Sequence, residues 1–533
     1  MALGVIFLLL FLITSFGGEY IVKSEDPTKV VGKVKKRIGR DLYLVEIDDR
    51  LLNGLELSGK VLIEKNYPLR TLQTPNDPCT DRKQELDMVR AKEAWDLSTG
   101  SDTVYVAVLD TGVDYNHPDL KDNLWRNPDE ICDNNTDDDR NGYVDDCYGI
   151  DAVNGDSDPM DDNGHGTAVA SVLGAVGNNA RLIPGINWKV KIIPCKLLDS
   201  SGAGSVAGEL ECLEYILSLK RNKRLNIVAV NASYGAEYPD SQFQREKIEE
   251  LAQEGILYIT AAGNEGKNND VVNLNPCNYD LENMICVGSV DLNGERSYFS
   301  NFSFNKVKIS APGEGILALK AGNTSESCDS LLKLSGTSLS TPFVTGAVAL
   351  LKSYEPSLSY GEVRRRILLT GRKYTSLAGQ NYTCSVLDFH ALLRNESFPK
   401  ACPSTLVLSW GDVSDCSPRT REFMVRNTGA TPVQVVRVSL EGRGFSLQED
   451  NCSGRTLSSF EECSVLITFY PSDKGTYSGR LYVSFSDSSL DFSAELSASS
   501  FAICGSGGCQ SSTSNLFTFL LALSLLILRR LPR

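Results

Sequence analysis

Residues 104–112 read VYVAVLDTG, an apolar run that ends in an acid and a glycine. Similar runs recur along the chain, and most are continuously apolar, as expected for parallel strands covered by helices on both faces. The expected strands are 104–109, 190–195, 227–231, 256–261, 284–290 and 307–310. Helical stretches such as 208–220 and 245–254 alternate with them, so the pattern predicts a doubly wound α/β fold with a mainly parallel sheet.

The size and charge of the chain exclude some classes of protein. Its 533 residues exceed the usual length of one domain, and 41% hydrophobic residues suffice for a large core. The formal net charge of -15 disfavours a nucleic-acid binder, because such proteins present a basic face. We therefore expect two or three folded units and no nucleic-acid partner.

Three polar clusters fall where an α/β domain places its site, at strand ends and helix starts. Asp110 ends the first strand, His165 precedes an apolar helix at 168–176, and Ser338 precedes a helix at 343–353. A serine hydroxyl needs an adjacent base, histidine has a suitable pKa, and a buried carboxylate holds the imidazole tautomer. The clusters thus predict a nucleophile, its general base and an orienting acid.

Local details support these roles. Pro342 is expected in the first turn of its helix, where a missing N–H costs little. Free N–H groups at that helix start would face negative charge developing beside Ser338. Gly166 and Gly336 allow close backbone approach.

The remaining candidates have simpler interpretations. The chain has three histidines; His117 is expected in a turn and His390 in a surface helix. Asp114 is interpreted as a solvated acid or a turn acid. Asp110 ends a buried strand, where an unpaired acid is costly, so we expect it to pair with His165.

The three clusters resemble the signature motifs of the subtilase family of serine proteases, in the same chain order. The motifs are Asp-Thr-Gly at 110–112, His-Gly-Thr at 165–167 and Gly-Thr-Ser-x-Ser-x-Pro at 336–342. The resemblance covers about residues 91–396 and implies a serine endopeptidase with Asp110, His165 and Ser338 as catalytic triad. The chain departs from the family pattern at Ala168, where most relatives carry a second histidine.

Two more segments extend the resemblance. Asn264, in Thr-Ala-Ala-Gly-Asn, stands where the family's asparagine donates a hydrogen bond to the oxyanion. Residues 231–235, Asn-Ala-Ser-Tyr-Gly, resemble the strand edge that pairs with the substrate backbone. The resemblance implies that protein or peptide substrates add a strand there. The implied substrate contacts are Ser233, Tyr234, Gly235 and Gly263.

An acidic loop lies between the first two motifs. Its alternating oxygen-bearing residues and a glycine at 142 resemble the first half of a calcium loop. The expected ligands are Asp137, Asp139, Asn141, Tyr143 and Asp145. The glutamate of the twelfth position is missing, because Tyr148 stands there. A solvated acidic insertion is the alternative, but so many neighbouring carboxylates repel one another without a cation, which favours Ca²⁺.

The N-terminal residues indicate export and processing. An apolar run at 5–16, followed by small residues, predicts a signal peptide at 1–18. Residues 19–74 have the size of a small domain, with strand-like runs at 20–23, 42–47 and 60–65. Because a subtilase domain follows at 75–400, the resemblance implies a small α+β propeptide that assists folding and blocks the cleft. We expect its cleavage within 67–77.

The C-terminal third changes character. Short alternating runs between turns predict an all-β sandwich at 401–500, which resembles the immunoglobulin-like modules of bacterial surface enzymes. The tail at 501–533 holds a Gly/Ser/Cys segment, an apolar stretch at 516–528 and a basic end. This order resembles bacterial sorting tails and predicts membrane or cell-surface anchoring. A plain tail anchor and a GPI signal remain alternatives.

The fifteen cysteines indicate an oxidising compartment. Zinc-finger spacing is absent from the sequence, so disulfides are favoured over a metal site. Short-range candidates for pairing are Cys132/Cys147, Cys195/Cys212, Cys277/Cys286 and Cys452/Cys463. We expect a secreted or cell-surface protein, made by a cell with a bacterial-type envelope.

Two rival functions stay open at this point. The first is a surface binding protein on an inactive protease scaffold, with the β-sandwich as its working part. Completeness of the triad, together with Asn264, favours an active enzyme instead. The second is an acidic Glu/Asp/Ser protease of the sedolisin type, which the His-Gly-Thr motif disfavours.

Overall fold

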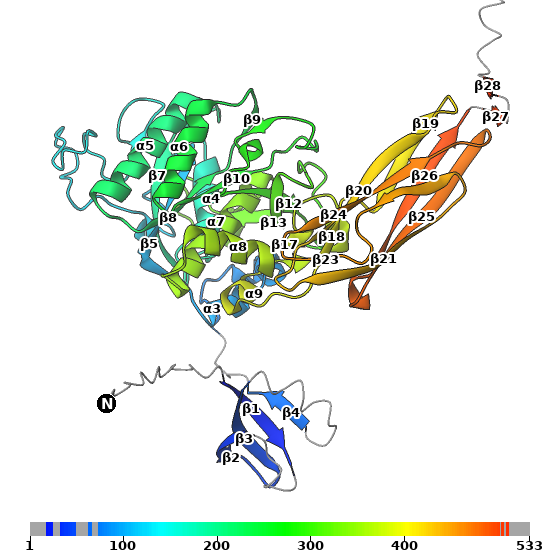
Figure 1. The fold of residues 1–533 in the computed structure, drawn as a ribbon. Coiled ribbons are helices and arrows are strands. Elements are labelled where there is room, and N and C mark those ends of the chain that lie inside the picture. Colours follow the sequence, from blue (N-terminus) through cyan, green and yellow to red (C-terminus); the bar gives the residue numbers. More distant parts are fainter. Residues whose placement is uncertain are drawn as a thin grey trace, which may run out of the picture. The chain divides into compact units, whose positions relative to one another are not determined.

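The computed structural model describes residues 17–24, 32–48, 62–66, 73–501, 503–505 and 508–510. These residues belong to two units, Met1–Leu72 and Gln73–Arg533, which are described separately (Figure 1). Most of the expected signal peptide and the apolar stretch at 516–528 lie outside the described residues. Within the described part of the chain, every helix is too short or too polar to span a bilayer.

The first unit contains an antiparallel sheet of order β2-β3-β1-β4. Its strands are β1 (Gly17–Lys23), β2 (Lys33–Arg37), β3 (Leu42–Asp48) and β4 (Leu62–Lys65). Tyr20, Val22, Tyr43, Val45 and Ile47 form its core. The three expected strands are present within the described residues, and β2 is an additional exposed strand with the basic sequence Lys-Val-Lys-Lys-Arg.

A mainly parallel sheet forms the centre of the second unit, in the order β16-β17-β13-β12-β10-β8-β5-β7-β6. Only β16 runs antiparallel to its neighbour within this described sheet. The strands are β5 (Gly100–Asp110), β6 (Ile150–Asp151), β7 (Lys189–Lys196), β8 (Ile227–Ala232), β10 (Leu257–Ala261), β12 (Met284–Val290), β13 (Val307–Pro312), β16 (Arg372–Lys373) and β17 (Ser385–Val386). Each expected strand is therefore confirmed, with ends shifted by a few residues.

Helices cover both faces of this sheet (Figure 1). The long ones are α4 (His165–Gly174), α5 (Val206–Asn222), α6 (Gln242–Gln253), α7 (Thr337–Tyr354) and α8 (Tyr360–Thr370), with short α2 (Gln84–Met88), α3 (Ala91–Trp95) and α9 (Phe389–Arg394). Alternate side chains of β5 enter separate cores: Val106 and Val108 pack with α4 and α7, whereas Ala107 and Leu109 pack with α5 and α6. Because side chains alternate along a strand, Asp110 points to the α4 and α7 side.

Helix α7 begins earlier than the sequence suggests. It starts at Thr337 rather than near Phe343, so Pro342 lies in the helix interior and not in the first turn. A proline there leaves the carbonyl four residues earlier without its helical donor. That carbonyl belongs to Ser338, and the Ser233 hydroxyl donates to it at 2.9 Å. The serine after β8 thus replaces the bond that the proline removes.

The C-terminal region is an all-β sandwich. Its two sheets have the orders β18-β20-β24-β22 and β19-β26-β25-β21-β23, and all pairs are antiparallel except β19 with β26. The strands are β18 (Ala401–Pro403), β19 (Val407–Val413), β20 (Arg419–Asn427), β21 (Val433–Glu441), β22 (Phe445–Asp450), β23 (Thr456–Leu457), β24 (Glu462–Phe469), β25 (Gly475–Phe485) and β26 (Phe492–Ser500). Residues from both sheets share one buried core, including Phe423, Val435, Phe469 and Leu481.

Disulfides fasten several parts of the second unit. All four short-range pairs expected from the sequence are present. Among the bonds between described residues, the sequence did not predict that Cys79 pairs with Cys328 across 249 residues or that Cys384 pairs with Cys402. The second of these joins the end of the α/β domain to β18. Cross-links of this kind stabilise the fold by restricting the unfolded chain.

Arg426 of β20 links the sandwich to the α/β domain. Its guanidinium lies 4.0 Å from the Phe304 ring centre and 3.8 Å from that of Tyr382. It also donates to the Phe304 carbonyl at 2.9 Å and to Glu462 at 2.9 Å. The side chain is buried, so its stacking and hydrogen bonds take place away from water.

Replacing Arg426 by lysine keeps the charge but removes the planar stacking and the forked donors. We expect this change to lower the free energy of unfolding by about 2 kcal/mol in urea denaturation. The matched change Glu462→Gln removes only the charge of a half-exposed partner and should cost less than about 1 kcal/mol. Equal effects of the two substitutions would contradict a stacked, buried role for Arg426.

Candidate active site

The first two predicted site residues are in contact. Asp110 is the last residue of β5, and His165 is the first residue of α4. The Nδ1 atom of His165 lies 2.6 Å from Oδ1 of Asp110, which is fully buried. The Asp110 carboxylate raises the pKa of His165 above its usual value, although burial opposes the shift. With Nδ1 donating to the acid, Nε2 of a neutral imidazole is left as an acceptor.

Tight backbone packing makes this contact possible. A Cβ on Gly166 would lie 2.0 Å from the Gly112 carbonyl and 3.0 Å from the Asp110 Cβ. Only glycine therefore lets α4 approach the end of β5 this closely. At Gly336, by contrast, the nearest atom to an added Cβ would be Nδ2 of Asn264 at 3.7 Å, so close approach is confirmed only for Gly166.

Asp161 is a supporting residue that the sequence reasoning missed. Its carboxylate accepts hydrogen bonds from the Thr111 hydroxyl at 2.8 Å and from the Gly164 and Thr167 backbone N–H groups. It thereby joins the segment after β5 to the first turn of α4. The sequence could have indicated this role, because Asp161 stands four residues before His165, and an acid just ahead of a helix often accepts hydrogen bonds from its first N–H groups.

Ser338 is the second residue of α7 and faces the same pocket as His165. Its Oγ donates to the Ser233 carbonyl at 2.9 Å, while the Ser233 hydroxyl donates to the Ser338 carbonyl. Asn231 holds this pair in place, because its Nδ2 donates to the Ser233 hydroxyl at 2.9 Å. In this resting arrangement the Ser338 proton points at a backbone carbonyl, so reaction requires its hydroxyl to turn to His165.

The neighbouring Asn264 has a defined amide orientation. Its Oδ1 accepts from the backbone N–H of Thr337 at 2.8 Å and from the Thr337 hydroxyl at 3.0 Å. Since a backbone N–H can only donate, the oxygen must face Thr337 and Nδ2 must point elsewhere. Asn264 lines the same pocket as Ser338, so the amide can offer a donor there.

The predicted substrate contacts surround one pocket of about 380 Å³. Its lining includes Ser233, Tyr234, Gly235 and Gly263 with His165, Asn264 and Ser338. The residues come from the ends of β8 and β10 and the starts of α4 and α7. The structure thus brings together every residue predicted for catalysis or substrate contact except Asp110, which lies buried behind His165.

Asp114 and His117 lie in one turn, in which the His117 N–H donates to the Asp114 carbonyl, as expected for His117 and for one of the two interpretations of Asp114. Asp114 is buried rather than solvated, because it accepts from the backbone N–H groups of Asn116 and Gly322. His117 is also buried, and its Nδ1 accepts from the Asp119 N–H. The turn is therefore packed inside the fold, and its polar side chains satisfy backbone groups. Ser340, two residues after Ser338, is buried, and its hydroxyl donates to the Ala311 carbonyl.

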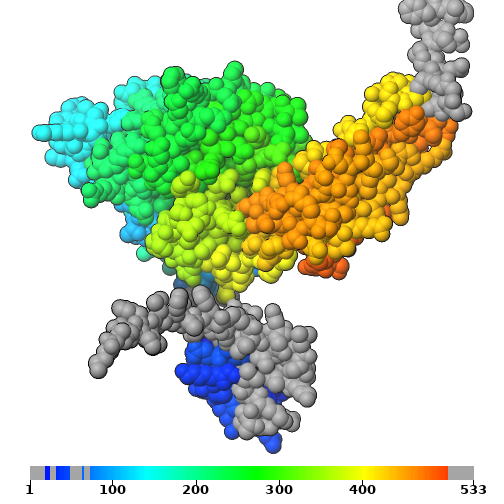
Figure 2. All heavy atoms as spheres, in the orientation of Figure 1, coloured from blue at the N-terminus to red at the C-terminus, as the bar shows by residue number. Residues whose placement is uncertain are grey.

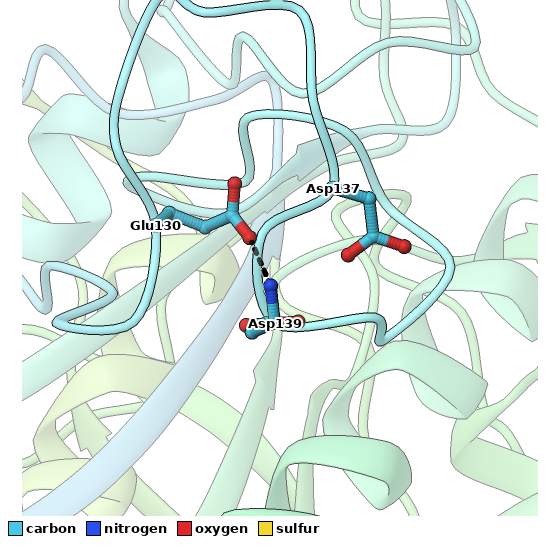
Figure 3. Close-up of side chains that lie close together, drawn as sticks. All are labelled: Glu130, Asp137 and Asp139. Carbon is cyan, nitrogen blue, oxygen red and sulfur yellow. Dashed lines mark hydrogen bonds between the residues drawn. The ribbon is translucent and has the colours of Figure 1, made fainter.

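The acidic loop gathers three carboxylates (Figure 3). Oxygen atoms of Glu130, Asp137 and Asp139 lie within 4.8 Å of one another. Figure 2 shows the cyan part of the chain, which includes this loop, at the surface. Glu130 precedes the predicted ligands and was missed, because the spacing pattern begins at Asp137. Its Oε1 accepts from the Asp139 N–H, whereas its buried Oε2 has no hydrogen-bond partner.

The other predicted ligands have separate contacts. Both Asp145 oxygens accept backbone N–H groups of the same loop, from Asn134 and Asn135. The Asn141 amide nitrogen donates to Asp139 and Asp146, and the Tyr143 ring packs on that of Tyr215. The side chains that converge are thus Glu130, Asp137 and Asp139. Lys223 also contacts Asp139 and supplies one positive charge.

The three histidines give a direct test of the site's electrostatics. Burial lowers the pKa of His117 and of His390, whereas Asp110 raises that of His165. An NMR titration should show one histidine above the usual value of about 6.5 and two below it. Asp110→Asn removes the stabilising charge and should move only the high pKa downward. An unchanged high pKa in that variant would contradict the contact.

Comparison with known proteins agrees with this geometry. A model of the subtilase family matches residues 101–384. Subtilisin-like protease 1 of Plasmodium berghei (strain Anka) is 31% identical over 337 residues, which cover 58% of this chain and 54% of that protein. Thermitase of Thermoactinomyces vulgaris is 33% identical over 287 residues, or 54% of this chain and 88% of that protein.

The chain spans about half the length of the Plasmodium relative. A solved structure, described as proteases from Pseudoalteromonas arctica PAMC 21717, superposes with a TM-score of 0.50 at 25% identity. It covers 61% of this chain and 99% of its own. The family match extends over more than half of the sequence and includes the pocket that holds His165. The chain belongs to the subtilase family.

Proposed function

We propose that this chain is a secreted or surface-attached serine endopeptidase, made as a preproprotein, that hydrolyses peptide bonds through an acyl-enzyme intermediate. One observation carries the proposal: the buried Asp110 carboxylate contacts His165 in a pocket that also holds Ser338 and Asn264. A scaffold used only for binding has no need of this arrangement. A buried acid that raises the pKa of a histidine in a pocket is the arrangement that a general base uses.

The reaction follows from the described atoms. A substrate in the pocket displaces the resting hydrogen bond of Ser338, and the Ser338 hydroxyl turns to Nε2 of His165. His165 takes the proton as Oγ attacks the peptide carbonyl, and Asp110 stabilises the imidazolium. His165 then returns the proton to the leaving amine. Water, activated in the same way, hydrolyses the acyl-enzyme and frees Ser338.

In the transition state the carbonyl oxygen of the substrate gains negative charge, which hydrogen-bond donors must stabilise. Nδ2 of Asn264 is held toward the pocket by the two bonds that its Oδ1 accepts from Thr337. The N–H groups in the first turn of α7 lie beside Ser338 and add positive potential. Such prearranged donors stabilise the oxyanion more than they stabilise the planar substrate. The substrate backbone would pair with the edge at Ser233–Gly235.

Fluorophosphonate labelling and casein hydrolysis test the nucleophile. The wild-type protein should label and hydrolyse, whereas Ser338→Ala should label at no measurable rate and lose about 10⁶-fold in kcat. Ser335→Ala, an exposed serine three residues earlier, is the matched control and should keep both activities. Equal labelling of wild type and Ser338→Ala would refute the assignment.

We also propose that the acidic loop binds Ca²⁺. The residues present fit a hard cation, because one carboxylate oxygen each of Glu130, Asp137 and Asp139 converge within 4.8 Å (Figure 3), and the buried Glu130 Oε2 atom has no hydrogen-bond partner. Glu130, Asp137 and Asp139 would hold the ion, with loop carbonyls and water completing its shell. The ion would stabilise the loop by neutralising these acids, together with Lys223. The role is structural and separate from catalysis.

Calcium titration of the chelator-treated protein tests this site. Calcium at a hundred times its Kd should stabilise the fold by about 2.7 kcal/mol. Glu130→Gln should weaken binding about tenfold or more, since affinity follows the number of charged ligands. Asp133→Asn, an exposed acid of the same loop at positive φ, should leave affinity unchanged. Equal affinities of the two variants would contradict the site.

The segment 19–74 is proposed to be a propeptide. Residues from Gln73 belong to the second unit, where Asp77 accepts N–H groups of Asn178 and Asn179 and is buried. A chain cut within 67–77 would keep these anchoring contacts if the cut falls before Asp77. Mass spectrometry of the mature protein should find its first residue in this range. A secreted, active protein that still begins at Glu19 would contradict processing.

The C-terminal parts are proposed to serve location rather than chemistry. We interpret the sandwich as an immunoglobulin-like module, supported by its two packed sheets and single shared core. The tail at 501–533 is proposed to attach the protein to a membrane or cell surface. The disulfides support an extracellular location.

A further inference from the structure

A second hollow adjoins the pocket that contains Ser338. It has a volume of about 380 Å³ and shares Leu198, Gly202, Tyr234 and Gly235 with that pocket. Its other walls are mainly apolar and include Leu197 and Val206. A substrate strand paired along Ser233–Gly235 would pass from one hollow to the other. The second hollow can therefore receive a substrate side chain that is not at the scissile bond.

A buried acid, Glu209, lies in the lining of this hollow. Its Oε1 accepts from the Tyr258 hydroxyl at 2.6 Å, and its Oε2 accepts from the Gln244 amide. The hydroxyls of Tyr238 and Tyr279 donate to the Gln244 carbonyl oxygen, which fixes the amide nitrogen toward Glu209. The donors in these contacts are neutral, so they solvate the carboxylate without neutralising it.

Two further features bear on the charge of Glu209. It lies in the first turn of α5, where the helix N-terminus favours a negative charge. Burial acts in the opposite direction and raises its pKa to about 7. The two carboxylate oxygens can accept four hydrogen bonds in all, and the Tyr234 hydroxyl is a third donor beside Tyr258 and Gln244. Acceptor capacity thus remains for one donor that enters from the hollow.

We propose that Glu209 makes this hollow select a lysine or arginine side chain of the substrate. Apolar walls above an acidic floor suit a side chain with an apolar stem and a cationic end. The inference rests on the proposed peptidase function and adds a specificity that the residues around Ser338 do not supply. If Glu209 served only to hold Gln244 and Tyr258, its charge would not affect substrate choice.

A peptide library with one position at a time fixed as lysine or norleucine tests this inference. Norleucine keeps the apolar stem and lacks the ammonium group. One position other than the residues flanking the cleaved bond should favour lysine by about tenfold or more in kcat/KM. In Glu209→Gln, which keeps the shape and hydrogen-bonding capacity, that ratio should fall to about two or less, with norleucine peptides cleaved as by wild type.

Control variants separate charge from folding. Glu211→Gln removes an exposed acid of the same helix and should leave the lysine preference intact. The fluorophosphonate labelling rate of each variant reports an intact site around Ser338. If Glu209→Gln fails to fold, Val206→Lys introduces a competing cation into the hollow and should abolish the preference instead.

The outcomes distinguish this inference from the proposed function. Cleavage by wild type with no lysine preference at any such position, or a preference unchanged in Glu209→Gln, would overturn the role of Glu209 alone. Absence of both labelling and cleavage in the wild-type protein would overturn the peptidase function and this inference with it.

Discussion

The site depends on one contact, the 2.6 Å approach of His165 Nδ1 to the buried Asp110 carboxylate. A buried carboxylate is costly unless it has a partner, and an imidazole acts as a base only when its tautomer is fixed. The contact meets both requirements together. It exists because β5 ends with its acid turned toward α4, and because Gly166 lets that helix approach the strand end. Asp161 then fixes the two segments relative to each other.

The nucleophile is positioned by a second set of contacts. Ser233 and Ser338 exchange hydrogen bonds between side chain and backbone, and Asn231 binds both Ser233 and Thr345 of α7. Pro342 belongs to this arrangement, since it frees the carbonyl that Ser233 uses. The end of β8 and the start of α7 are thereby held as one rigid piece. The same strand end forms the edge proposed for substrate, so catalysis and binding share their support.

Much of this could be predicted from the sequence. Continuous apolar strands specified the parallel sheet, and an acid at a strand end with a histidine and a serine at helix starts specified which residues converge. Contacts made by residues outside the motifs could not be predicted, because spacing patterns describe one segment at a time. Glu130 joins Asp137 and Asp139 from outside the loop motif, and Glu209 lies under a pocket through folding alone. The early start of α7 was missed because proline usually marks a helix's first turn.

A double-mutant cycle on the rate of Ser338 phosphonylation tests the central claim most directly. Asp110→Asn, His165→Ala and the double variant would be compared with wild type. If Asp110 acts through His165, the aspartate substitution should slow labelling strongly in the wild-type background and hardly at all once His165 is absent. Equal slowing in both backgrounds would show that Asp110 contributes independently of His165, and would contradict the account.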